Sequence, residues 1–290
     1  MIERSEILAR IQKLPAFSTT VVRLSALVND PEADAGEFEA VVLPDVALTA
    51  NLLRMANSAY FGLSRRIATA REAITLLGVR RVFDLGAMAA VDAVVPDILP
   101  GYGIDAGVFW SHSVAVAVVA ERLAKERKLA TSAMTFTAGL LHDIGKLVIS
   151  NFLADRLDDL RSELASGAPS LVDCERKLLG ADHAQIGAEL AAVWNLPEEV
   201  VKAVAFHHLP GVANGEHGNV LVDLVHAADC LSHSMGFGAD VDETQRQIDN
   251  PVLTRLGLRQ SDLDHVASRA LPEIEGLSQF GRWKRKGGTT

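Results

Sequence analysis

Apolar residues recur at the helical period in segment after segment of this chain, and this pattern constrains the fold more than any other feature. Over residues 45–57, Leu48, Leu52 and Met55 fall on one apolar stripe, and Asp45 stands where a helix N-cap is expected. The same period predicts further helices over 71–77, 79–95, 110–127, 134–149, 183–194, 197–208 and 219–235.

One apolar run also resembles a buried strand. Residues 114–119 are rich in valine, but they lie inside a continuous segment without turn residues. No Asn-Gly type of turn separates two alternating runs elsewhere in the chain. The sequence therefore predicts an all-α protein, with a helix across this run.

Breaks in the helical pattern suggest how the chain is divided. Residues 96–107 contain two prolines and three glycines, a composition that suits a linker. We therefore expect an N-terminal helical bundle over 1–98 and a second bundle over 107–237. Residues 238–290 are expected to form a C-terminal extension of two weaker helices and a basic tail.

Charge and composition exclude several classes of protein. The chain has 28 Lys and Arg against 37 Asp and Glu, a net charge of −9, which disfavours binding to duplex nucleic acid or to anionic membranes. It has no apolar run of transmembrane length and no hydrophobic N-terminal signal. Cys174 and Cys230 form no CxxC motif and are expected to be reduced thiols. These features predict a cytoplasmic protein without a membrane segment.

A His-Asp pair is the first chemical motif. His142 and Asp143 adjoin each other, and on a helix they would point about 100° apart around its axis. Imidazole and carboxylate are both good ligands for Fe, Mn or Zn. Lys146 follows one turn later and is expected to reach the same side and bind a phosphate oxygen. Gly145 between them is expected to relieve crowding.

Other predicted helices carry further candidate ligands. A carboxylate such as Asp229, among apolar neighbours on a helix, is costly unless it is paired or bound to metal. The residues alone leave alternatives open, because core histidines, helix-dipole partners and a salt bridge would give the same pattern. His226 and His233 flank this aspartate as hydrogen-bond partners or as rival ligands. The candidates outside the His-Asp pair are His112, His183, His207, His208 and Asp229.

Several segments together resemble one known family. GLLHDIGKL (139–147), ADHAQIGAELAAVWNLP (181–197) and AVAFHHLP (203–210) are similar to the HDOD domain of the HD superfamily. LPAFSTTVVRL (14–24), LLRMANSAYFG (52–62) and AITLLGVRRV (73–82) resemble the opening of that domain. The resemblance covers roughly residues 10–235. It implies two packed helical bundles, the second of HD type, in a bacterial cytoplasmic signalling module that acts through a protein or ligand partner.

The resemblance extends to the metal-dependent HD-GYP phosphodiesterases. Their pattern implies Lys146 as a phosphate contact, but the GYP stretch is absent after His208, and Val108 replaces the glutamate of a third metal site. What remains is a site for up to two Fe, Mn or Zn ions without the known substrate-recognition element. The implied ligands are His112, His142, Asp143, His183, His207, His208 and Asp229.

Three functions compete at this point. The family resemblance favours a signalling module with an unknown protein partner. The alternative is a metal-dependent phosphohydrolase acting on a nucleotide or another phosphoester. In it, Asp143 would bridge two metals and Lys146 would stabilise charge on the phosphoryl group. Nucleic-acid binding ranks last and rests only on basic residues that also suit a partner or anion surface. These are Arg65, Arg66, Arg71, Arg80 and Arg81.

Overall fold

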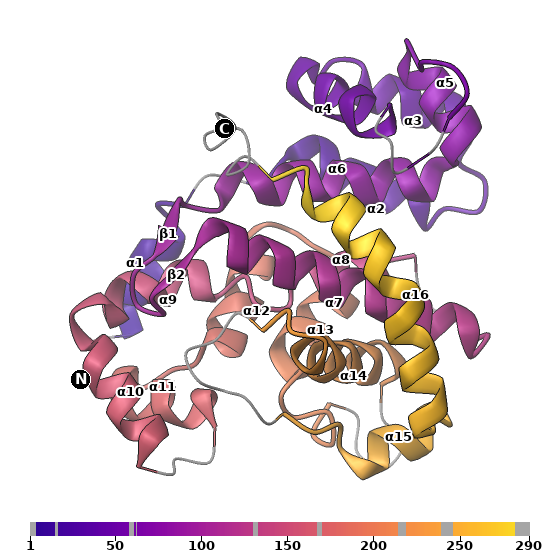
Figure 1. Ribbon diagram of the computed structural model, residues 1–290. Coiled ribbons are helices and arrows are strands. Elements are labelled where there is room, and N and C mark those ends of the chain that lie inside the picture. Colours follow the sequence, from indigo (N-terminus) through magenta and orange to yellow (C-terminus); the bar gives the residue numbers. More distant parts are fainter. Residues whose placement is uncertain are drawn as a thin grey trace, which may run out of the picture.

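The computed structural model confirms the all-α prediction, and its only sheet among the residues described is a short hairpin (Figure 1). The structure describes residues 4–14, 17–57, 61, 63–129, 133–166, 170–213, 219–238 and 246–281. The predicted basic tail at 282–290 lies outside these residues, as does part of the LLRMANSAYFG segment, namely 58–60 and 62.

The N-terminal helices are α1 (Arg4–Ile11), α2 (Thr19–Val28), α3 (Ala35–Val42), α4 (Val46–Ala56), α5 (Ala70–Leu77) and α6 (Val79–Val94). The hairpin is β1 (Ile98–Leu99) and β2 (Ile104–Asp105), paired antiparallel. The second half contains α7 (Ala106–Glu126), α8 (Thr135–Leu141), α9 (Lys146–Leu153), the 3-10 turn η2 (Ala154–Arg156), α10 (Leu157–Ala165), α11 (Leu171–Leu179), α12 (His183–Val193), α13 (Glu198–Phe206) and α14 (Val220–Ser234). The C-terminal helices are α15 (Asn250–Leu256) and α16 (Gln260–Ser278).

Capping residues fix the helix boundaries, and two of these lie where the sequence predicted. Asp45 accepts a hydrogen bond from the Leu48 N–H at 2.9 Å, so α4 begins where expected. Gly78 ends α5 with a φ of +81°, a conformation that favours glycine. In α7, the Asp105 carboxylate accepts from the Val108 N–H at 2.9 Å, and the helix therefore starts four residues before the predicted position 110.

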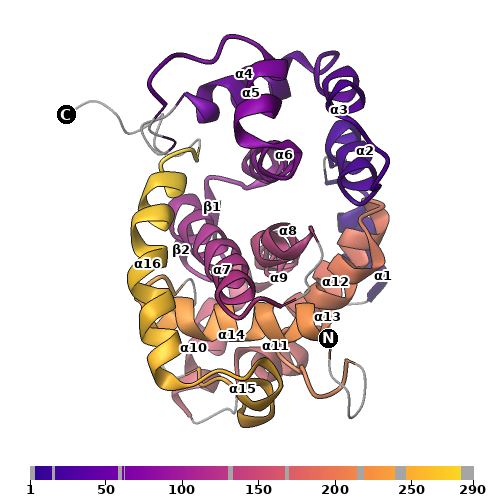
Figure 2. The ribbon, with the colours of Figure 1, turned by 90° about the vertical axis from the view of Figure 1, so that its right-hand side faces the viewer.

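Helix α7 is the long central element of the second half. All residues from Val114 to Ala120 are buried, so the valine-rich run is a helix that is apolar on every side. Helix α16 packs along it (Figure 2), and the buried Trp110 indole donates a hydrogen bond to the Ser278 carbonyl at 3.1 Å. Helix α8 lies beside α7 and also contacts α6, α13 and α14.

The predicted helix over residues 134–149 is wrong, because the chain breaks at the His-Asp pair. Helix α8 ends at Leu141 and α9 begins at Lys146. Between them the backbone tightens into i to i+3 hydrogen bonds, such as Lys146 N–H to the Asp143 carbonyl at 2.9 Å. Gly145 does not relieve crowding as expected; its backbone packs so closely on α12 that a Cβ atom would overlap the His183 carbonyl.

The predicted linker at 96–107 is an anchored hairpin. The Gly101 N–H donates to Ser150 Oγ at 3.0 Å, and Tyr102 is fully buried. Helix α1 contacts α9. The division into bundles at 1–98, 107–237 and 238–290 stays a prediction. None of the helices in the described part of the chain has the length and apolar character needed to cross a membrane.

A partly buried cluster of basic and acidic residues joins α6 to α7. The Arg81 guanidinium lies 3.1 Å from Glu121 and 3.5 Å from Asp84, and it stacks over the Phe136 ring of α8 at 5.8 Å. Asp84 is 1% exposed, and its Oδ1 makes no hydrogen bond within the described residues. Burial and the Glu121 charge raise the pKa of Asp84 to about 8 against the opposing effect of Arg81. This acid is therefore protonated in the folded protein near neutral pH.

The replacement Asp84→Asn is expected to change how stability depends on pH. Between its unfolded pKa near 4 and its folded pKa of about 8, Asp84 binds a proton only in the folded protein. The wild-type free energy of unfolding should therefore fall, relative to Asp84→Asn, by up to about 1.4 kcal/mol per pH unit as pH rises through this window. Urea unfolding at several pH values measures this, with the exposed Asp158→Asn as control. Parallel profiles for wild type and Asp84→Asn would contradict it.

Candidate metal centre

The structure brings all seven predicted metal ligands together inside the second half. His112 lies on α7, and His142 and Asp143 lie in the break between α8 and α9. The others come from the start of α12, the end of α13 and the middle of α14; they are His183, His207, His208 and Asp229. Their donor atoms form overlapping groups in which all atoms lie within 4.8 Å of one another. All are buried except His208, which is partly exposed.

Four of these residues converge on one point, which we call the first position. The Nε2 atoms of His112 and His142 are 3.1 Å apart, and each is 3.5 Å from Asp143 Oδ2. Asp229 Oδ1 lies 3.3 and 3.7 Å from the same two nitrogens. Ligands at about 2.1 Å from a metal are roughly 3.0–3.4 Å from one another. The spacing at the first position therefore suits a metal ion.

A second position lies on the other side of Asp143. Its Oδ1 is 3.2 Å from His183 Nε2 and 3.8 Å from His207 Nε2. The Nε2 atoms of His183 and His208 are 2.8 Å apart. Because one oxygen of Asp143 faces each position, this carboxylate has the geometry of a bridging ligand.

Hydrogen bonds fix the orientation of four of the histidine rings. In each ring, Nδ1 lies 2.7 Å from an acceptor oxygen. The acceptors are the backbone carbonyls of Phe237 for His112, Gly139 for His142 and Val204 for His207, and the Glu175 carboxylate for His183. These oxygens only accept, so in each ring Nδ1 carries a hydrogen and Nε2 is directed at the cluster. Metal-bound histidines have this arrangement, with the outer nitrogen donating to a carbonyl or carboxylate.

The cluster requires positive charge at its centre. Neutral rings that donate through Nδ1 present lone pairs at Nε2, so the close Nε2 contacts between them would be repulsive without a cation. Within the described part of the chain, the buried atoms Asp143 Oδ1, Asp229 Oδ1 and His207 Nε2 make no hydrogen bond. Nitrogen and carboxylate donors of this kind suit Fe, Mn or Zn. The residues present therefore fit the metal that the sequence implied.

Basic side chains of the protein partly neutralise the carboxylates of Asp143 and Asp229. Burial alone would raise the pKa of Asp143 and Asp229, but Lys146 and Arg246, with the histidines, lower both pKa values well below the ordinary range. Burial would also lower the pKa of His112, but contacts with the two carboxylates raise it to about 9. Without a metal, protons on the histidines therefore supply part of the missing charge, and a metal must displace them.

Lys146 lies on the same side as Asp143 and contacts it directly. Its Nζ lies 2.7 Å from Asp143 Oδ2 and 5.5 Å from the centre of the Tyr102 ring, and the side chain is fully buried. The ammonium group therefore neutralises Asp143. Its expected contact with a phosphate stays a prediction.

Two contributors to the site were not predicted as site residues. Glu175 on α11 accepts from the His183 backbone N–H at 2.8 Å, from its Nδ1, and from the Tyr102 hydroxyl at 2.6 Å. Arg246 contacts Asp229 Oδ2 and is 7% exposed, so the salt-bridge alternative for Asp229 is also present. Glutamate and arginine at these distances along the chain follow no local spacing rule, and only the tertiary fold reveals them.

Most of the predicted basic surface is paired internally. Arg71 pairs with Glu39, Arg65 with Glu72, and Arg80 and Arg81 with Glu121.

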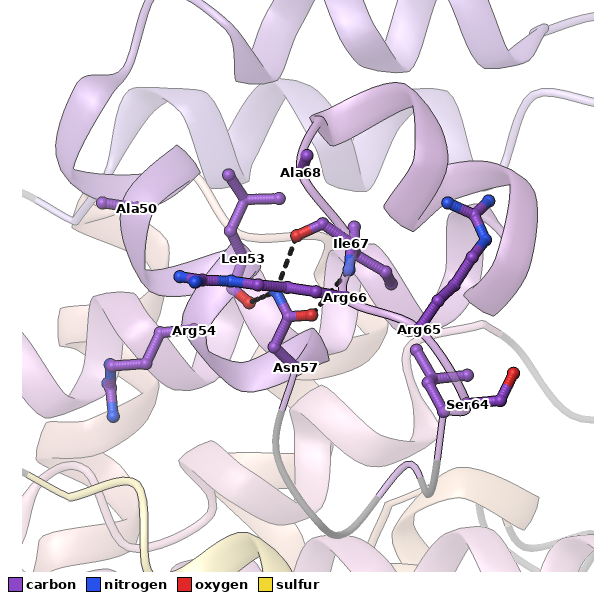
Figure 3. Close-up of a pocket in the computed structure, with 10 residues that line it drawn as sticks. Ala50, Leu53, Arg54, Asn57, Ser64, Arg65, Arg66, Ile67 and Ala68 are labelled. Carbon is purple, nitrogen blue, oxygen red and sulfur yellow. Dashed lines mark hydrogen bonds between the residues drawn. The ribbon is translucent and has the colours of Figure 1, made fainter.

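A cavity of about 960 Å³ lies beside α4, lined by Leu53, Arg54, Asn57, Arg65 and Arg66 among others. The guanidinium groups of Arg54 and Arg66 lie on the same side of it, whereas Arg65 points the other way (Figure 3).

Asn57 shapes this pocket. Its side-chain amide donates to the Leu53 and Ile67 carbonyls at 2.7 Å, and its Oδ1 accepts from the Ile67 N–H at 2.6 Å (Figure 3). The end of α4 is thereby held against the segment that precedes α5. The wall of the pocket that Asn57 holds in place therefore lies beside long arginine side chains. This arrangement suits an anionic group.

Comparison with known proteins agrees with this architecture. The sequence matches the HDOD domain family over residues 14–210. The chain belongs to the HDOD domain family. An uncharacterized protein of Treponema pallidum is 30% identical over 202 residues, which cover 69% of this chain and 38% of that protein. The chain therefore spans less than half the length of this relative.

Solved structures show the same fold over nearly the whole chain. A crystal structure of a candidate phosphohydrolase from Shewanella amazonensis superposes with a TM-score of 0.72 at 26% identity, covering 96% of this chain and 97% of the other. An HDOD domain protein of unknown function from Geobacter sulfurreducens gives 0.74 at 22% identity, covering 96% and 98%. The HDOD protein supports the fold assignment to both halves and to the C-terminal helices.

The replacement Glu175→Gln is expected to weaken metal binding at the second position. A glutamine keeps the shape and can still accept from His183, but it removes the charge that makes this imidazole a stronger ligand. We expect the affinity for Mn²⁺ to fall about 10- to 100-fold, as measured by calorimetry. Tyr102→Phe, which removes the tyrosine hydroxyl's hydrogen bond to Glu175 but leaves both bonds from His183, is the matched control and should have a smaller effect. Equal affinities in wild type and Glu175→Gln would contradict the assigned role.

Proposed function

We propose that this protein is an HDOD signalling module whose second half contains a centre for up to two divalent metal ions. The observation that carries the proposal is the shared orientation of four histidines, each donating through Nδ1 and directing Nε2 at the Asp143 carboxylate. Without a bound cation, only protonated histidines could satisfy the buried oxygens Asp143 Oδ1 and Asp229 Oδ1.

Each residue has a defined part in this proposal. His112, His142, Asp143 and Asp229 would hold an ion at the first position. Asp143 with the histidines at the ends of α12 and α13, His183, His207 and His208, would hold one at the second. Bound Fe, Mn or Zn would polarise a phosphate oxygen or a water molecule. Lys146 neutralises Asp143, and Glu175 orients His183.

The burial of the cluster favours signalling over turnover. A catalytic metal keeps an open position for substrate, whereas a structural one is closed by protein groups. His112, His142, Asp143 and His183 have no exposed surface, and among the seven ligands, all of which the structure describes, His208 alone is partly exposed. The centre would then stabilise the bundle and respond to metal supply, while other surfaces contact the partner.

The arginine pocket of the N-terminal half is the proposed partner surface. Arg54 and Arg66 present guanidinium groups beside the apolar Leu53, a combination that suits an acidic protein segment or a phosphate-bearing ligand. The chain as a whole is acidic, so this patch is locally distinct. Cys174 and Cys230 are both free and buried, as expected in the reducing cytoplasm that we propose for the protein.

A metal-dependent phosphohydrolase is the second candidate. It is favoured by the bridging geometry of Asp143 and by the likeness to the candidate phosphohydrolase of Shewanella amazonensis. The missing GYP stretch disfavours cyclic di-GMP as substrate, which leaves nucleotides and other phosphoesters. Nucleic acid remains the least favoured ligand, because the acidic chain pairs most of its predicted arginine cluster internally.

Metal content provides the direct test of the centre. Protein purified without chelator and without a nickel column should contain about two Fe, Mn or Zn ions per chain. Asp143→Asn should lose both ions, because this residue faces both positions, whereas Asp229→Asn should retain the second. Elemental analysis of the folded variants measures this, with His265→Gln on the surface of α16 as control. A wild-type protein free of metal, and unable to take up added Mn²⁺, would refute the proposal.

Turnover separates the two functions. With Mn²⁺ or Fe²⁺ loaded, the signalling proposal expects hydrolysis of bis(p-nitrophenyl) phosphate and of nucleotide phosphoesters no faster than for the Asp143→Asn protein. Hydrolysis at least about 100-fold above that variant, with a further dependence on Lys146, would instead establish the phosphohydrolase. Lys146→Met serves as the second variant in this assay.

A further inference from the structure

We infer that His233 is an additional ligand of the first position, so that this position is more fully enclosed by the protein than the second. The inference rests on the proposed metal centre and extends it beyond the ligand set that the sequence resemblance implied. His233 lies on α14, one turn after Asp229, and its side chain is 7% exposed.

The geometry of His233 matches that of the other ligands. Its Nε2 is 3.5 Å from Asp229 Oδ1, and its donor atom lies within 4.8 Å of those of His112 and Asp229. Its ring meets the His112 ring edge to face, with centroids 5.0 Å apart, as the rings of His112 and His142 also do. Histidines arranged around one ion approach one another in this way, because each directs one nitrogen at the same point.

The turn after α14 fixes the ring. A Cβ atom at Gly238 would lie 2.9 Å from His233 Nδ1, so the backbone packs directly against the outer edge of the imidazole. In the same turn, the Phe237 carbonyl accepts from His112 Nδ1 at 2.7 Å. One short segment therefore positions two rings of the first position.

Asp229 is held so that one oxygen remains for the ion. Its Oδ2 contacts Arg246, while Oδ1 faces His112, His142 and His233. With His233, the first position has five candidate donors, in two groups of three that share His112, whereas the second has one group of four and includes the partly exposed His208. A set of three imidazoles and two carboxylates suits Fe or Mn with up to six ligands better than tetrahedral Zn.

The consequence is a difference between the two positions. A six-coordinate ion at the first position would have one place left for another ligand. An anion or water entering the centre would therefore bind chiefly at the second position, next to His208. The first ion would exchange slowly and the second more readily.

The test is a titration of metal-stripped protein with Mn²⁺, in which electron paramagnetic resonance measures the free ion. Wild type should bind a tight first equivalent and a weaker second one. His233→Gln should weaken the first by at least about 10-fold and leave the second unchanged. Gly238→Ala, which displaces the ring without changing the ligand, should also weaken the first equivalent. Unfolding temperatures of the stripped proteins show that both variants fold.

His226→Gln is the matched control, because His226 lies on the same helix but already uses Nε2 to accept from the Asp249 N–H at 3.2 Å. It should leave the first equivalent unchanged. If His233→Gln binds both equivalents as wild type does, the inference is wrong and the proposed centre stands. If the His226 variant loses the first equivalent equally, the effect reflects damage to α14 and the inference also fails. If wild type binds no Mn²⁺, the centre itself is refuted.

Discussion

Two carboxylates buried in an otherwise apolar core are the constraint on which the second half of this protein depends. Asp143 has no exposed surface and Asp229 has 1%, and removing one partner of a buried charge typically costs about 3–5 kcal/mol. Lys146 and Arg246 each contact one of them, and histidines from α7, α12, α13 and the break after α8 surround both. The surrounding backbone serves the same purpose, because carbonyls of three separate segments anchor the outer ring nitrogens.

Helix α8 places this centre in contact with the rest of the molecule. Its Phe136 packs under Arg81 of α6, in the cluster of basic and acidic residues that contains the buried acid Asp84. Two residues from its other end, the Gly139 carbonyl anchors the His142 ring. A seven-residue helix thus contacts both the junction between the halves and the ligands. A movement of α6 relative to α7 would therefore act on the histidine and aspartate cluster through α8. A change at that cluster would act on the contact between α6 and α7 through the same helix.

The sequence was sufficient to predict what depends on local pattern and what depends on family resemblance. Apolar periodicity and caps such as Asp45 and Gly78 predicted the helices, because these signals act within one or two turns. These local signals did not predict the helix break at His142, because the break follows from the close packing of Gly145 on α12, which is a tertiary contact. Glu175 and Arg246 were not predicted for the same reason: each contacts its histidine or aspartate across a turn or loop whose path the local pattern does not determine.

Helix α14 lies outside the family match but contributes to the candidate metal centre. The family match ends at residue 210, before the helix that contributes Asp229 and the turn that anchors His112. A fragment cut at that boundary would lose a carboxylate, a ring anchor and the helix that packs on α7 and α8. Family boundaries therefore understate the physical domain here, and relatives that share residues 14–210 need not share its chemistry.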